Sequence, residues 1–175
     1  MEIEVTPAEP PASGRLAWPK GGARCALGRT GVAQEKREGD GATPAGLLPL
    51  RSVLYRPDRE APPATRLIVR PIAPEDGWCD DPLLPEYNRL VRRPFPGRHE
   101  ILWRADGLYD LVVLLGWNDD PPVPGLGSAI FLHVAAADYA PTQGCVALAR
   151  ADLLRLLADC GPGDRLIVNL PRPEK

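Results

Sequence analysis

Prolines occur along almost the whole chain and leave few stretches in which a long helix could form. There are 22 prolines and 17 glycines among 175 residues, whereas proline makes up about 5% of an average chain. A proline inside a helix removes one hydrogen bond and clashes with the preceding turn. The sequence therefore predicts a mainly β fold with short strands and long connections. Because 44% of the residues are hydrophobic, one domain with a genuine core is expected.

Apolar runs between turn residues predict the strands. Residues 100–105 and 108–117 flank Asp106-Gly107, and two such runs joined by Asp-Gly are a strong signal for a hairpin. The second run is nearly all apolar, so we expect a central strand that is covered on both faces. Further strands are expected at residues 15–18, 23–27, 47–55, 65–70 and 163–170.

One helix is expected, at residues 150–160. Leucines at 153, 154, 156 and 157 form an i, i+3, i+4 stripe, and Gly161-Pro162 follows, which is a typical helix end. Together the elements predict a mixed-sheet sandwich with one α-helix. Residues 1–13 are interpreted as a flexible arm or edge strand, residues 14–170 as the domain, and residues 171–175 as a tail.

The balance of charge argues against a general nucleic-acid binder, because 21 basic and 23 acidic residues give a net charge of −2. The first residues, Met1-Glu-Ile-Glu, lack the basic and apolar regions of a signal peptide. We therefore expect a cytoplasmic protein, or a periplasmic one if a leader is missing or export is unconventional. No apolar run is long enough to span a bilayer. Four scattered cysteines, with only His99 and His133 as imidazoles, do not predict a metal site.

A histidine and a cysteine close to each other in the chain are the main candidates for chemistry. The apolar run 129–132 ends at His133, and Gly144 places Cys145 before another apolar segment. A cysteine nucleophile needs a base that takes its proton and backbone N–H groups that face an oxyanion. Gly144 allows a backbone geometry that a Cβ would resist. The alternative is that both residues simply pack in the core.

The segment Thr142-Gln143-Gly144-Cys145-Val146, preceded by His133, resembles the signature of the L,D-transpeptidase catalytic domain, the YkuD-type family of peptidoglycan enzymes. Residues 38–46 resemble that family's Thr-Pro-x-Gly segment. Residues 78–132 resemble a proteobacterial branch with Asp-Asp-Pro, Tyr-Asn-Arg, Leu-Tyr-Asp and Gly-Ser-Ala-Ile-Phe-Leu-His. The resemblance covers roughly residues 15–170. Two positions depart from it: Gln143 replaces a second histidine, and Ala147 replaces an arginine.

The resemblance implies an acyl transfer on murein stem peptides that end in D-alanine. Cys145 would attack the carbonyl of the third stem residue, and His133 would take the thiol proton and return it to the departing amine. Backbone amides near Gly144 and Cys145 would hold the oxyanion, and no metal or cofactor is implied. Attack by water on the thioester makes an L,D-carboxypeptidase, and attack by an amine makes a transpeptidase that forms 3→3 cross-links. The expected cytoplasmic location, Gln143 and Ala147 favour the carboxypeptidase and a role in murein recycling.

Two other classes of protein remain open. One is a non-catalytic domain that binds cell-wall peptides or a protein partner. The other is a papain-like acyl transferase, although in those enzymes the histidine usually follows the cysteine. The group that orients His133 is a backbone carbonyl or Asp138, and the oligomeric state is not predicted.

Several further residues are candidates for substrate binding. Thr142, Gln143 and Tyr139 lie beside the cysteine in sequence. By resemblance, Trp78, Tyr87 and Asn88 form part of a substrate-side wall, with packing in the core or rim as the alternative. Arg92 and Arg93 belong to a basic cluster with Arg89, Arg98 and His99, which is either a solvated face or a site for stem-peptide carboxylates. Asp80 and Asp81 are adjacent, so their side chains point to opposite faces of an extended chain and do not predict a shared-proton pair.

Overall fold

The computed structural model describes residues 1–171, and most of its strands belong to one large sheet. The strands are β1 (Glu2–Ala8), β2 (Ser13–Trp18), β3 (Gly21–Ala26), β4 (Val32–Ala33), β5 (Thr43–Pro44), β6 (Gly46–Tyr55), β7 (Ile68–Pro71), β8 (Asp76–Cys79), β9 (Leu90–Arg92), β10 (His99–Ile101), β11 (Leu111–Leu115), β12 (Phe131–Val134), β13 (Val146–Leu148) and β14 (Arg165–Val168). The helix α1 spans Arg150–Asp159. The prediction of a mainly β fold with one helix after the cysteine is confirmed.

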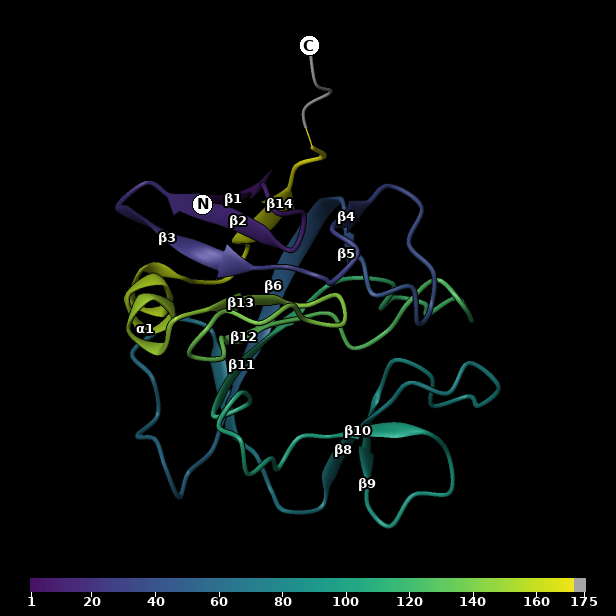
Figure 1. Ribbon diagram of the computed structural model, residues 1–175. Coiled ribbons are helices and arrows are strands. Elements are labelled where there is room, and N and C mark those ends of the chain that lie inside the picture. The colour runs from purple at the N-terminus through teal and green to yellow at the C-terminus, as the bar shows by residue number, and fades with distance from the viewer. Residues whose placement is uncertain (172–175) are drawn as a thin grey trace.

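The large sheet closes on itself. Its strand order is β11-β12-β13-β3-β2-β1-β14-β6-β7, and β11 pairs in addition with β6, so that the strands from β11 to β6 form a barrel-like ring (Figure 1). The pairs β1–β14, β12–β13 and β6–β7 are parallel, while neighbours such as β2–β3 are antiparallel. The predicted mixed sheet is thus present, and closure satisfies backbone groups that open edges would expose.

The helix α1 covers part of this sheet with its leucine stripe. Leu153, Leu156 and Leu157 are completely buried and belong to the main hydrophobic core. The helix packs against β3 and β12 (Figure 1). Each fully buried leucine contributes about 1.5–3 kcal/mol relative to an exposed one, so the stripe fixes the helix directly after the strand that follows Cys145.

The interpretation of residues 1–13 as a flexible arm is wrong for Glu2–Ala8. This segment is the internal strand β1, which pairs with β2 on one side and with β14 on the other. Ile3 and Val5 are completely buried, and they alternate with exposed Glu2 and Glu4. The period-two pattern of a half-buried strand is therefore present, and it prevails over the nearby prolines. Of the predicted tail, residues 172–175 lie outside the described residues.

The hairpin predicted around Asp106-Gly107 is also wrong. The turn exists: Gly107 has a φ of 79°, and the Asp106 side chain accepts a hydrogen bond from the N–H of Leu108. The flanking strands, however, belong to different sheets, because β10 pairs with β8 whereas β11 pairs with β6 and β12. Leu111–Leu115 is almost entirely buried, and a strand of this kind needs partners on both edges.

A second, three-stranded sheet with the order β10-β8-β9 lies apart from the large one (Figure 1). A separate hydrophobic cluster links the two, and the Trp78 ring meets the Phe131 ring edge-on at 5.3 Å between centroids. Cys145 belongs to this cluster. The small sheet therefore faces the part of β12 that leads to His133. Within residues 1–171, none of the helical structure has the length and hydrophobicity needed to cross a lipid bilayer.

Candidate active site

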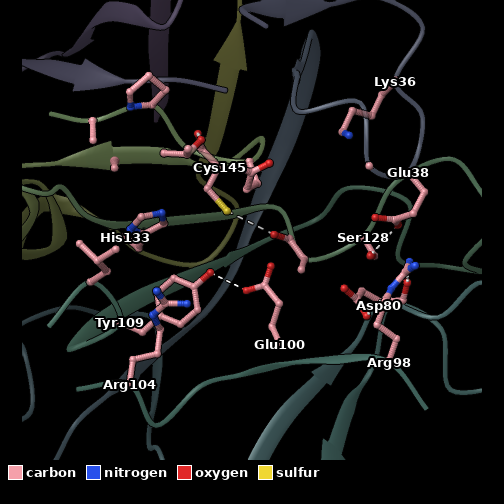
Figure 2. A pocket seen from close by; sticks show the side chains of 18 of the residues that line it. Lys36, Glu38, Asp80, Arg98, Glu100, Arg104, Tyr109, Ser128, His133 and Cys145 are labelled. Atoms are coloured by element: carbon pink, nitrogen blue, oxygen red, sulfur yellow. Dashed lines mark hydrogen bonds and ion pairs between the residues drawn. The ribbon is translucent and has the colours of Figure 1, made fainter. Parts of the chain in front are cut away.

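The parallel pairing of β12 with β13 brings His133 and Cys145 into one pocket. Val146 lies opposite Leu132, so that Cys145, just before β13, lies opposite Phe131, two residues before His133. Residues two apart on neighbouring strands share one face. Both side chains line a cavity of about 750 Å³. Figure 2 shows His133, Cys145 and Tyr109 on one side of this cavity.

The Cys145 thiol is held by backbone groups of the preceding strand region. Its Sγ donates to the carbonyl of Ala129 at 3.2 Å and accepts from the N–H of Phe131 at 3.4 Å. The residue is buried, and this burial raises the pKa of the thiol well above its ordinary value. At neutral pH the resting side chain is therefore a thiol and not a thiolate.

His133 is oriented by its own strand. Its Nδ1 lies 2.9 Å from the carbonyl oxygen of Val134, and a carbonyl can only accept, so Nδ1 carries the proton and Nε2 is left with a free lone pair. Between the two open alternatives for the orienting group, the structure selects a backbone carbonyl. Asp138 instead accepts a hydrogen bond from the N–H of Ala140. Burial lowers the pKa of His133 to about 4, so the imidazole is neutral at pH 7.

No hydrogen bond joins Cys145 to His133 in the part of the chain that the structure describes. A preformed thiolate–imidazolium pair would require a lowered thiol pKa and a raised imidazole pKa, and both shifts are in the opposite direction. The arrangement fits a neutral base that removes the thiol proton only when the sulfur leaves the Ala129 carbonyl to attack.

Gly144 shapes the turn that precedes the thiol. Its φ is +134°, and a Cβ at this position would lie 2.8 Å from the carbonyl oxygen of Ala42. Its N–H donates to Thr142 Oγ1 at 3.1 Å, and the Thr142 hydroxyl donates to the carbonyl of Cys145 at 2.7 Å. The Gly144 amide, predicted as an oxyanion donor, is therefore engaged within the turn. The Cys145 N–H has no hydrogen-bond partner among residues 1–171.

Of the other residues predicted beside the cysteine, two line the pocket and one does not. Thr142 and Gln143 are on its wall, and the Gln143 side-chain oxygen accepts a hydrogen bond from Arg29. Tyr139 lies outside, where the Arg24 guanidinium stacks 4.5 Å from its ring centre.

The predicted wall residues do not line the pocket. They are Trp78, Tyr87 and Asn88, and they lie behind the residues that line it. The Asn88 side-chain oxygen accepts from Trp78 Nε1 at 2.9 Å and from the N–H of Ala129 at 3.0 Å. Its Nδ2 donates to two carbonyls of the loop after β11. Tyr87 donates from its hydroxyl to Glu38 at 2.5 Å. These residues thus hold wall residues in place.

Arg92 and Arg93 lie away from the pocket as well. Arg92 pairs with buried Asp76 at 3.1 Å, and Arg93 contacts the carbonyl of Pro74. From the predicted basic cluster, Arg98 is on the pocket wall, and it forms an ion pair with Asp80 at 3.1 Å.

Sequence analysis did not single out the remaining charged residues of the pocket. They are Lys36, Glu38, Glu100 and Arg104. Glu38 lies in the segment that carries part of the family resemblance, which was a usable signal. Glu100 and Arg104 lie in the segment that we interpreted as a strand of a hairpin. That interpretation did not assign them to a functional site. Among the described residues, no three His, Cys, Asp or Glu side chains are grouped as a metal site requires.

Comparison with protein families agrees with this geometry. The family model of the YkuD L,D-transpeptidase catalytic domain matches residues 12–168. The chain therefore belongs to the L,D-transpeptidase catalytic domain family, whose members are cysteine-dependent enzymes that act on peptidoglycan stem peptides. Searches of curated proteins and of solved structures give no significant match.

Proposed function

We propose that this chain is an L,D-carboxypeptidase that removes the terminal D-alanine from murein tetrapeptides, with Cys145 as nucleophile and His133 as base. The observation that carries the proposal is that a cysteine with a free backbone N–H and a neutral histidine with a free Nε2 line the same pocket. Family membership supplies the substrate class and acyl transfer.

The first half-reaction forms a thioester. As Sγ turns from the Ala129 carbonyl towards the substrate, Nε2 of His133 takes its proton, and the sulfur bonds to the carbonyl carbon of the third stem residue. The Cys145 N–H is the oxyanion donor. The bond to the D-alanine nitrogen then breaks, and the imidazolium gives its proton to the departing amine. The histidine returns to its neutral form, and free D-alanine leaves.

The second half-reaction is hydrolysis of the thioester. The pocket volume of about 750 Å³ is within the roughly 300–1,000 Å³ of sites that hold a single ligand. One stem end can occupy such a space together with a water molecule. For cross-linking, a second stem would have to enter the same cavity. Ala147, which departs from the arginine of the family pattern that the chain resembles, also supports an acceptor other than a second stem.

The alternative within the same chemistry is a transpeptidase that forms 3→3 cross-links. Purified protein incubated with a disaccharide-tetrapeptide and analysed by mass spectrometry distinguishes the two. Loss of D-alanine with gain of water is the expected result, and Cys145→Ala must abolish it. Dimers that lack one D-alanine would replace the carboxypeptidase by the transpeptidase. Wild type that behaves like Cys145→Ala would instead favour a domain that only binds cell-wall peptides.

A further inference from the structure

Glu100 brings a carboxylate from the small sheet to the catalytic side of the pocket. It lies on β10, and its Oε2 accepts a hydrogen bond of 2.5 Å from the Tyr109 hydroxyl. Its other oxygen has no hydrogen-bond partner within residues 1–171. Figure 2 shows the Glu100 side chain rising between Tyr109 and the charged residues of the far wall, below the Cys145 sulfur.

Tyr109 fixes this carboxylate relative to the histidine. The Tyr109 ring meets the His133 ring edge-on at 5.2 Å and the Phe131 ring at 6.0 Å. The Arg104 guanidinium lies 5.0 Å from the centre of the Tyr109 ring. The tyrosine is buried on both sides, so its hydroxyl holds one Glu100 oxygen in a set position and leaves the other available to a molecule in the pocket.

The electrostatic surroundings make Glu100 a stronger base than an ordinary carboxylate. Burial raises the pKa of Glu100, and the negative charges of Asp80 and Glu38 on the same pocket act in the same direction. The Tyr109 hydroxyl and the Arg104 guanidinium oppose that shift and keep the ionised form accessible. The negative charge of Glu100 in turn raises the pKa of the Cys145 thiol.

We propose that Glu100 is the general base for the water that hydrolyses the thioester, and that Tyr109 is the residue that positions it. This inference rests on the proposed carboxypeptidase function and divides its two half-reactions between two bases. His133 serves the attack of sulfur, and Glu100 serves the attack of water.

The step balances within the residues of the site. The free oxygen of Glu100 takes one proton from water while the water oxygen bonds to the thioester carbon. The tetrahedral intermediate collapses and the C–S bond breaks, which leaves the tripeptide acid and a Cys145 thiolate. Protonated Glu100 then gives its proton to the sulfur, so that both side chains return to their starting forms.

This division predicts that removing the Glu100 charge affects the two half-reactions in opposite directions. Without the charge, the thiolate of Cys145 costs less to form, so acylation proceeds at the wild-type rate or faster. Without the base, hydrolysis of the thioester slows by about a hundredfold or more, which is the usual contribution of general base catalysis. A residue that only supported the fold would slow both steps together.

The test is Glu100→Gln with a disaccharide-tetrapeptide as substrate and intact-protein mass spectrometry as readout. We expect the variant to release one equivalent of D-alanine and to accumulate the acyl-enzyme, whereas wild type accumulates little. Hydroxylamine is a strong nucleophile that needs no base, so its addition should discharge the trapped acyl group. Asp138→Asn makes the same chemical change at a surface carboxylate outside the pocket and should match wild type.

Hydrolysis in Glu100→Gln within about threefold of wild type would overturn the role of Glu100, and so would an equal loss of acylation and hydrolysis. If wild type itself is not acylated by the tetrapeptide, the proposed function fails. The same comparison made with p-nitrophenyl acetate, which acylates thiols without a stem peptide, then decides the role of Glu100 independently. Tyr109→Phe should slow hydrolysis by a smaller factor than Glu100→Gln, because the base remains but loses its fixed position.

Discussion

The thiol of Cys145 donates its hydrogen bond to the carbonyl of Ala129, at 3.2 Å, and not to the imidazole of His133. Ala129 has a φ of +53°, a conformation that is uncommon for a residue with a side chain. The Asn88 side chain holds the N–H of the same residue at 3.0 Å. The resting position of the sulfur therefore depends on a strained backbone and on a buried amide that contacts neither the sulfur nor the pocket.

The pH dependence of alkylation should distinguish a neutral thiol from a preformed ion pair. Because burial raises the pKa of Cys145, the thiolate fraction grows about tenfold per pH unit throughout the neutral range. We expect the rate of Cys145 modification by iodoacetamide to rise continuously from pH 6 to 9, as measured by peptide mass spectrometry.

Labelling at the other cysteines provides the control for that experiment. Cys25 and Cys160 lie in the main core, and burial raises the pKa of each to about 12. They do not line the pocket, so they should stay unmodified while Cys145 reacts. A rate at Cys145 that is constant between pH 5 and 8 would instead reveal a thiolate stabilised by His133.

Replacing Asn88 by alanine should reduce both stability and turnover. All the hydrogen-bonding capacity of its side chain is used: two N–H donors reach its oxygen and two carbonyls accept from its nitrogen. Each buried group left without a partner costs about 1–3 kcal/mol. We expect a loss on the order of 3 kcal/mol in urea unfolding, and a kcat that falls more than KM changes.

Asn169→Ala is the matched control for that variant. Asn169 is exposed, and its side chain makes no hydrogen bond within residues 1–171, so its removal should alter stability by about 0.5 kcal/mol or less. Equal effects of the two substitutions would contradict the role of Asn88 in holding Ala129.

The sequence was informative about the two central residues because their signals are local. An apolar run that ends in His133, and a glycine before Cys145, are patterns within a few residues, and the leucine stripe of α1 is one as well. The Asn88–Ala129 contact joins residues 41 positions apart, and the Glu100–Tyr109 bond joins β10 of the small sheet to the turn before β11 of the large one. Neither follows from periodicity, since both depend on how the small sheet docks onto the large one.

The errors of prediction have the same origin. Asp106-Gly107 does form a turn, but the choice of strand partner is decided by the need of Leu111–Leu115 for neighbours on both edges. β1 was not expected because Pro7 lies within it and Pro10 and Pro11 follow it, although its period-two pattern is clear. Local chemistry thus indicated where the chain turns, whereas long-range burial determined which strands meet.

Gly144→Ala should disturb the turn that presents Cys145. The φ of +134° is strained for any residue with a Cβ, and the added methyl group would lie 2.8 Å from the Ala42 carbonyl oxygen. Strain of this kind costs about 1–3 kcal/mol, and the clash adds to it. Gly163→Ala is the control, because Gly163 has a φ of +85° but open space around its Cβ position. We expect Gly144→Ala to lower the melting temperature more and to lose turnover, whereas Gly163→Ala keeps it; equal behaviour would show that the Ala42 contact is unimportant.

The buried neutral state of His133 should make the protein less stable in acid in a specific pH window. Its pKa is lowered to about 4 in the folded chain, against about 6.5 in the unfolded chain. Between these values the unfolded state binds a proton that the folded state does not, so stability falls as the pH decreases from 6.5 to 4. Outside that window the contribution is constant. A shift of this size corresponds to a decrease on the order of 3 kcal/mol in the free energy of unfolding.

His133→Asn isolates this contribution, because its amide can still donate to the Val134 carbonyl but does not titrate. The variant should therefore lose less stability between pH 7 and pH 4 than wild type does, as measured by urea unfolding at each pH. Glu100, whose raised pKa acts with the opposite sign, is present in both proteins and cancels in the difference. Parallel stability curves for wild type and variant would mean that folding does not lower the pKa of His133. If the variant instead loses more stability than wild type as the pH falls, the pKa of His133 is raised in the folded protein, and the neutral-base mechanism would have to be replaced by an ion pair.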